Sequence, residues 1–161
     1  LAFSFDSLVH AEDDVLEAYI NQLARKLRRD GVGFIHHSNL GEYKSYFSLI
    51  KKINLRRVMK VLEKIRLVDR DEGRSISVTA RKFEKYVEKA NMQCISQETI
   101  NWSTRRLIDC ISVFTQKGSI WTRTNKVMRN GRFMRETKWA SKLSDLYGVK
   151  SFKKSIETCL Q

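Results

Sequence analysis

The feature that most constrains the fold is a charged turn between two short apolar segments, residues 63–79 with the sequence EKIRLVDRDEGRSISVT. Apolar residues precede the charged segment DRDEGR, and Ile76 and Val78 alternate with polar residues after it. Alternation of this kind is typical of a strand. Gly73 offers the backbone freedom that a tight turn requires. The stretch therefore predicts two short strands joined by a charged hairpin.

Helical spacing of apolar residues predicts three helices before this hairpin and one after it. The first extends over residues 13–29, with acidic residues at its start and basic residues at its end, an order that suits the helix dipole. The segment Gly33–His37 predicts one short strand. A second helix follows Ser38 or Asn39, a third follows Asn54 as its cap, and a fourth follows the cap residue Thr79.

This order of elements resembles the winged-helix variant of the helix-turn-helix superfamily over about residues 12–91. The stretch LEKIRLVDRDEGRSISVT is similar to the helix-strand-wing-strand segment of many winged-helix proteins. The resemblance implies a mainly α fold with a small β-hairpin and a non-catalytic module that binds double-stranded DNA. In such a module the third helix enters the major groove. The acids Asp69, Asp71 and Glu72 disfavour close phosphate approach by the wing tip, so that Arg74 alone reaches the backbone or the minor groove, and a purely structural hairpin is the alternative. The residues placed at the DNA by this resemblance are Arg56, Arg57, Lys60, Lys64 and Arg74.

Residues 92–161 predict a basic helical extension, or a second, degenerate winged helix. Ser96 is a cap candidate for a long helix whose apolar residues continue to Phe114. The dipeptide Asn130-Gly131 is typical of a hairpin turn, so that residues 120–124 or 126–129 are extended. The alternative is a loop that leads into a helix at residues 133–147. A last short helix is expected at residues 152–160.

The charge of the chain favours a polyanionic partner. Lys and Arg number 31 against 18 Asp and Glu, a formal net charge of +13. Residues 101–161 hold 13 basic against 4 acidic residues, so that the excess is greatest in the C-terminal third. Such a balance is typical of nucleic-acid-binding proteins. No apolar segment approaches the roughly 18 residues that a membrane-spanning helix needs, so no membrane partner is expected.

Cations and aromatic rings are interleaved in residues 117–142, where eight basic residues face one acid. Cations neutralise phosphates, and rings such as Trp121 and Trp139 can stack on exposed bases. Single-stranded nucleic acid or RNA is therefore an alternative to duplex DNA. A further alternative is a winged-helix protein-interaction module in a transcription, replication, or telomere or chromatin assembly. The candidate phosphate-binding residues of this segment are Arg123, Lys126, Arg129, Arg132, Arg135 and Lys138.

No motif predicts catalysis, a metal or a cofactor. His36 and His37 are adjacent, so that they point to opposite sides of a strand and do not share one metal. The three cysteines lie far apart, which argues against a disulfide framework and a zinc site and favours a reducing intracellular compartment, the nucleus in a eukaryote. The start LAFS has neither a methionine nor a signal-peptide pattern, so we expect the sequence to belong to a longer protein.

Overall fold

The structure is a computed structural model that describes residues 1–52 and 73–147. Its packing divides the chain into two compact units, residues 1–131 and 132–161. The first unit contains a five-stranded mixed sheet with helices, which makes the fold α/β. The prediction of a mainly α winged helix with a small hairpin is therefore wrong. The sequence also placed a domain boundary near residue 91, whereas the sheet continues directly after it.

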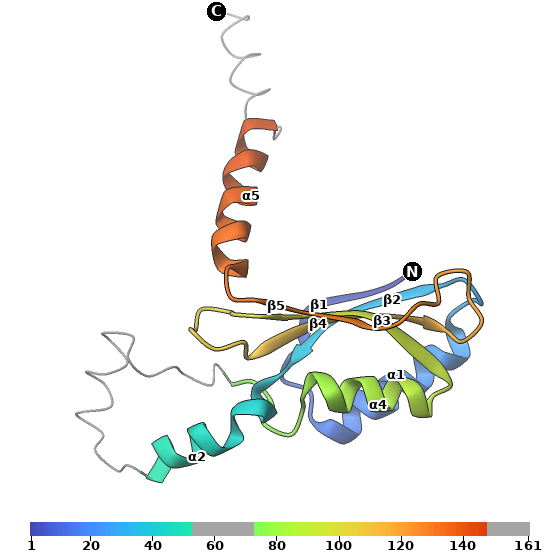
Figure 1. Cartoon of the computed structure of the whole chain (residues 1–161), viewed down its shortest axis with the longest axis horizontal. Coiled ribbons are helices and arrows are strands. Elements are labelled where there is room, and N and C mark those ends of the chain that lie inside the picture. Colours follow the sequence, from blue (N-terminus) through green and yellow to red (C-terminus); the bar gives the residue numbers. More distant parts are fainter. Residues whose placement is uncertain (53–72, 148–161) are drawn as a thin grey trace, which may run out of the picture. The chain divides into compact units, whose positions relative to one another are not determined.

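The sheet has the strand order β1-β2-β4-β3-β5. β1 pairs with β2 and β3 with β5 in parallel, and β4 is antiparallel to both of its neighbours. The carboxyl ends of β1, β2, β3 and β5 therefore lie at one end of the sheet, and β4 begins at that end (Figure 1). The strands are β1 (Ala2–Leu8), β2 (Val32–Ser38), β3 (Met92–Ile100), β4 (Asp109–Gln116) and β5 (Lys126–Asn130).

Helices α1 (Asp13–Lys26) and α4 (Ala80–Lys89) lie side by side on one face of the sheet (Figure 1). The first predicted helix is confirmed, three residues shorter at its end. The predicted cap of α4 is also confirmed, since the Thr79 hydroxyl accepts the Lys82 N–H at 3.1 Å. The core between helices and sheet is built from Leu16, Ile20, Ile35, Val78, Phe83, Tyr86, Val87, Met92, Cys94 and Phe114.

The predicted second helix is present in two pieces, a 3-10 turn η1 (Leu40–Tyr43) and α2 (Lys44–Lys52). The third helix and the first strand of the predicted wing lie outside the described residues. The return strand of the wing, residues 75–79, is wrong, because this segment is not a strand. Its backbone instead bonds to other loops: the Ser75 N–H donates to the Val9 carbonyl, and the Gly41 N–H donates to the Val78 carbonyl.

The long helix predicted after Ser96 is also wrong, since this region forms β3 and β4. Polar residues such as Gln97, Ser112 and Thr115 are buried in these strands along with the apolar ones, so that apolar and polar residues do not alternate cleanly and the spacing resembles a helix. The alternative strand at residues 126–129 is confirmed by β5, and the helix at 133–147 by α5 (Phe133–Tyr147). The last predicted helix lies outside the described residues. Across the described ranges, no helix is both long and apolar enough to cross a bilayer.

Candidate nucleic-acid interface

The face of the sheet opposite α1 and α4 carries no helix among the described residues of the first unit, and we call it the open face (Figure 1). The register of the sheet places one residue of each strand in a single row on this face: Phe3, Phe34, Val113, Ser96 and Lys126. The row begins with aromatic rings on the β1 side and ends with a cation on the β5 side. The open face is thus apolar at one edge and basic at the other.

The aromatic part of the row is accessible. The Phe3 ring stacks on the Phe34 ring, with centroids 5.1 Å apart, and Phe3 is 65% exposed. Phe5, two residues further along β1, is 37% exposed on the same side. These rings were not among the site residues predicted from the sequence. Their signal was the alternation of aromatic and small residues in AFSF, which is typical of a strand with one apolar face.

A second aromatic group lies beside this row. The Phe5 ring lies 4.7 Å from the His36 imidazole, and Trp102 contacts both, at 5.9 Å from Phe5 and 5.4 Å from His36. The Arg74 guanidinium lies 5.9 Å from the centre of the Trp102 ring. Trp102 belongs to the loop between β3 and β4, so that residues far apart in sequence together extend the aromatic surface.

Beneath these rings lies a buried charged cluster. The Asp109 carboxylate, 0% exposed, accepts from Arg74 Nε at 3.0 Å and from a second guanidinium nitrogen at 3.0 Å, and His36 Nε2 lies 3.2 Å away. The Asp6 N–H donates to His36 Nδ1 at 3.2 Å, so that the other ring nitrogen, Nε2, faces the Asp109 carboxylate. Burial acts to raise the pKa of Asp109, but the hydrogen bonds from His36 and Arg74 hold it below its usual value.

The Arg74 side chain is only 6% exposed because of this pairing. The resemblance had placed Arg74 on a wing tip in contact with nucleic acid. The structure places its guanidinium inside the protein, where it joins the segment before α4 to the first residue of β4. Asp109 directly follows the loop that carries Trp102, so that the cluster fixes this loop beside the open face. Arg74 thus contributes to the structure of the candidate site and not to contact with nucleic acid.

His37 points to the opposite side of β2 from His36, as its position next to it in the sequence predicted. Its ring stacks on Phe83 of α4 at 4.1 Å, and its two nitrogens bond to the Ser112 hydroxyl and the Ser38 carbonyl, each at 2.8 Å. Burial lowers the pKa of His37 to about 4, so that the ring is neutral at physiological pH.

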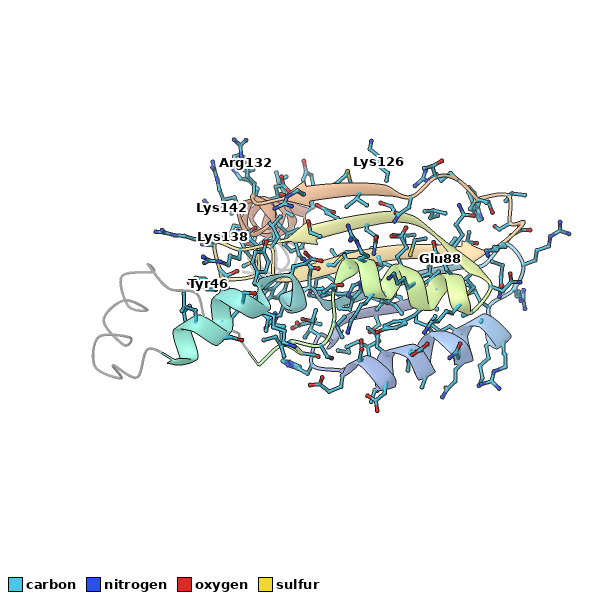
Figure 2. All side chains as sticks on the ribbon, turned by 60° about the horizontal axis from the view of Figure 1, so that its bottom comes forward. Tyr46, Glu88, Lys126, Arg132, Lys138 and Lys142 are labelled. Carbon is cyan, nitrogen blue, oxygen red and sulfur yellow. The ribbon has the colours of Figure 1, made fainter. Side chains whose placement is uncertain are left out.

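The predicted cations of the first unit do not share one face. Lys126 ends the row on the open face, and its side chain extends outward from β5 (Figure 2). Arg129 lies on the other side of β5, where it lines a pocket. Arg123 donates from Nε to the Ile95 carbonyl at 3.2 Å. The cations expected on the third helix, Arg56, Arg57, Lys60 and Lys64, lie outside the described residues.

The second unit carries its own basic surface. Arg132, Arg135, Lys138 and Lys142 are exposed and follow each other at spacings of three or four residues, which places them on one side of α5. Figure 2 shows three of these side chains, Arg132, Lys138 and Lys142. Arg132, Arg135 and Lys138 are predicted phosphate-binding residues, and together with Lys142 they form one basic stripe within the second unit.

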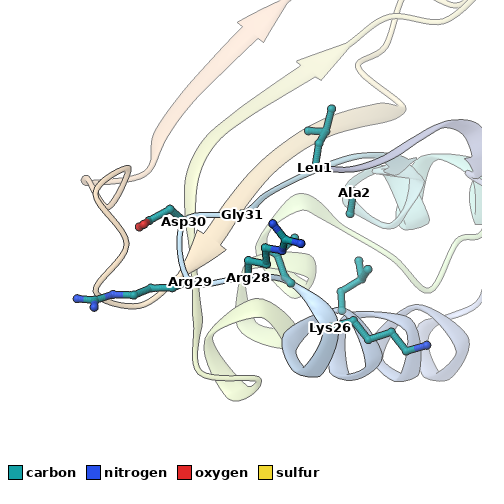
Figure 3. A pocket seen from close by; sticks show the side chains of 9 residues that line it. Leu1, Ala2, Lys26, Arg28, Arg29, Asp30 and Gly31 are labelled. Carbon is teal, nitrogen blue, oxygen red and sulfur yellow. The ribbon is translucent and has the colours of Figure 1, made fainter.

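A second group of cations, which the sequence analysis treated only as dipole partners, surrounds a pocket of about 630 Å³. Leu23 and Leu27 supply apolar lining, and Lys26, Arg28 and Arg29 supply positive charge. Figure 3 shows Arg28 directed toward Leu1 and Ala2, at the start of β1. Arg28 therefore lies near the start of β1, the strand that carries Phe3, whereas Arg29 and Lys26 extend away from Leu1 and Ala2.

No family model, curated protein or solved structure matches this chain. The fold and the site must therefore be interpreted from the residues themselves. Among the described residues, no three His, Cys, Asp or Glu side chains lie together in a way that could hold a metal ion. The open face can therefore stack bases on its exposed rings and attract phosphates through nearby cations.

Proposed function

We propose that the protein binds single-stranded nucleic acid across the open face of its sheet. The observation that carries the proposal is the row from the stacked Phe3 and Phe34 rings to Lys126. Every base has a flat π-surface that stacks on an aromatic ring, and each stacked base contributes about 1–3 kcal/mol of binding free energy. The row therefore offers bases a platform at one end and a phosphate contact at the other.

A single strand suits this surface better than a duplex. In a duplex the bases stack on each other, and proteins read them through elements inserted into a groove. The open face is a sheet surface whose rings lie close to the strands, so that only unstacked bases can reach them. The expected binding of duplex DNA depended on a winged-helix fold. Since the protein has a five-stranded mixed sheet instead, the fold no longer supports that mechanism.

The phosphate backbone is expected to contact cations at both edges of the open face. Lys126 lies at the β5 edge, and Arg28 lies near the start of β1. The basic stripe of α5 provides further phosphate contacts from the second unit. Cationic residues that neutralise phosphates release counterions, so that the affinity falls steeply as the salt concentration rises.

A protein-binding role for α5 is a second candidate function. Trp139, Leu143 and Tyr147 follow each other at four-residue spacing and are 68%, 45% and 86% exposed. Such an apolar stripe is typical of a helix that lies in the groove of a protein partner. Trp139→Ala with Leu143→Ala should then abolish binding to that partner while single-strand binding persists; loss of strand binding alone speaks against this role.

The cysteines fit the expected reducing compartment. Cys94 and Cys110 are free thiols in the core, and burial raises the pKa of both, that of Cys110 to about 12. Thiols held protonated in this way are inert, so that they need no oxidising environment.

Fluorescence anisotropy tests the proposal with labelled RNA and DNA strands of about 16 nucleotides and with the matching duplex. We expect both single strands to bind, the duplex to bind at least about tenfold more weakly, and the affinity to fall between about 50 and about 200 mM salt. Comparison of the RNA and DNA strands shows which sugar is preferred. Equal binding of the duplex, or no binding of any strand at low salt, contradicts the proposal.

A further inference from the structure

A separate pocket of about 440 Å³ lies on the side of the sheet that carries α1 and α4. Its walls come from η1 and the preceding Asn39, from the first half of α4, from the loop before β4, and from β3 and β5. In open α/β sheets, ligands bind outside the carboxyl ends of the strands. Thr99 and Arg129, each next to the last residue of its strand, place one side of the pocket near these ends, and none of the open-face rings lines it.

Two arginines from different elements line this pocket, Arg81 of α4 and Arg129 of β5. Both side chains are exposed, and neither makes a hydrogen bond or an ion pair with the described part of the chain. A guanidinium carries a fixed charge and a fork of donors that matches two phosphate oxygens. Two such groups at one pocket are typical of a site for a phosphate group.

The amide side chains of the pocket, those of Asn39 and Gln97, are already engaged in hydrogen bonds. The Asn39 side chain accepts the Ala80 N–H at 2.8 Å and donates to the Leu107 carbonyl at 2.9 Å. The Gln97 amide donates to the Ala80 carbonyl at 2.9 Å. Since Asn39 and the Thr79 hydroxyl already bond to amides of the first turn of α4, a phosphate here depends on the two guanidinium groups and not on the helix end.

The remaining walls point to a ligand larger than phosphate alone. Tyr43, held by the hydrogen bond that its hydroxyl accepts from the Leu107 N–H at 3.3 Å, supplies a half-buried ring, and Val127 adds an apolar surface. The Glu42 and Glu84 carboxylates also line the pocket and repel a bare anion, and Glu84 accepts a hydrogen bond from the Asn125 amide at 2.8 Å. A ligand with a phosphate, a flat ring and N–H donors satisfies the arginines, Tyr43 and Glu42 together.

We propose that this pocket binds a nucleoside monophosphate group. Its phosphate contacts Arg81 and Arg129, its base lies against Tyr43, and the exocyclic amino group of the base donates to Glu42. The same group occurs as a free nucleotide and as the phosphorylated terminal nucleotide of a single strand. The proposal does not rest on strand binding by the open face, because no residue of the open row lines this pocket.

Isothermal titration of the full chain with AMP, adenosine and inorganic phosphate tests this assignment. We expect AMP to bind more tightly than either of the other two, because only AMP uses both the arginines and the ring surface. Arg81→Gln and Arg129→Gln should each weaken AMP binding about tenfold or more, the loss typical of a charged hydrogen bond. Arg25→Gln, on α1 and outside the pocket, removes the same charge and should leave AMP binding unchanged.

Three results overturn the proposal: adenosine binding as tight as AMP binding, AMP binding that survives loss of both pocket arginines, or no AMP binding at millimolar concentration.

Competition identifies the source of the ligand. A strand with a terminal phosphate that displaces AMP, when its hydroxyl-ended form does not, supports the terminal nucleotide; AMP binding without such competition supports a free nucleotide. Phe3→Ala should weaken strand binding without changing AMP affinity, so that either proposal can fail alone.

Discussion

The ring of Phe3 stacks on the ring of Phe34, with centroids 5.1 Å and planes 17° apart. The two residues are paired in the register between β1 and β2, on the face of the sheet away from α1 and α4. Such a pair holds an exposed ring in one orientation, so that a base stacks on it without first ordering the side chain. The proposed function depends on this pre-organised ring.

Asp109→Asn should destabilise the protein by about 3–5 kcal/mol, because it leaves the charge of Arg74 buried without its partner. Urea denaturation at neutral pH measures this loss. Asp6→Asn is the matched control, since the Asp6 carboxylate is 51% exposed and 4.0 Å from Arg74, and its loss should cost less than about 1 kcal/mol. Equal losses in the two variants contradict the structural importance of the buried pair.

The stability of the protein should fall as the pH drops from about 6.5 toward about 4, because of His37. The buried ring has its pKa lowered to about 4, whereas the unfolded chain takes up a proton near the ordinary value of 6.5. Within this window the unfolded state binds more protons, so that the unfolding free energy falls by up to about 1.4 kcal/mol per pH unit. Above this window the contribution is complete and constant.

Urea denaturation between pH 5 and 7 checks this dependence. His37→Gln should remove most of the slope, since the variant has no titrating group at this site. Asp109 acts in a different window: its lowered pKa provides stability that is present above the usual value of 3.8 and is lost at lower pH. A slope that is unchanged in the His37 variant contradicts the neutral buried ring.

Helices α1, α4 and α5 and the strand β2, predicted at Gly33–His37, could be predicted from the sequence, because their signals are local. The acidic start and basic end of α1, the Thr79 cap and the periodicity of α5 each depend on neighbouring residues. The sheet could not be predicted in this way. β1 is held by pairing with β2 more than twenty residues away, and β3 and β4 bury polar residues such as Gln97 and Ser112, so that they lack a clean alternation of apolar and polar residues.

For the candidate site, the sequence predicted the class of partner but few of the residues. The excess of cations indicated a polyanion, and Lys126 does lie on the open face. The partner of Arg74 could not be found from the sequence, because Asp109 is thirty-five residues away and nothing marks it as buried. The aromatic platform was missed since Phe3 and Phe34 meet only when β1 and β2 pair.

Lys126→Gln should weaken single-strand binding and lower the slope of log affinity against log salt by about one, the change expected for one lost phosphate contact. Anisotropy titrations at several salt concentrations give this slope. Lys44→Gln, an exposed lysine at the start of α2 and outside the open row, should leave the slope unchanged. A slope that does not respond to Lys126 places the backbone of the strand elsewhere.

Removal of residues 132–161 should leave a folded first unit, because the core that joins α1, α4 and the sheet lies entirely within residues 1–131. The shortened chain should still unfold cooperatively on heating, as followed by circular dichroism. Its affinity for single strands should fall at low salt, since the basic stripe of α5 is lost. Loss of cooperative unfolding contradicts the independence of the first unit.

The central claim is tested most directly by the affinity of Phe3→Ala for a labelled single strand. Phe3 is 65% exposed, so its removal should leave the fold intact, which thermal unfolding verifies. Tyr19→Ala is the matched control, an aromatic residue of α1 that is 42% exposed on the other side of the sheet. We predict about tenfold weaker binding for Phe3→Ala and no change for Tyr19→Ala. Unchanged affinity in Phe3→Ala, or an equal loss in both variants, contradicts single-strand binding at the open face.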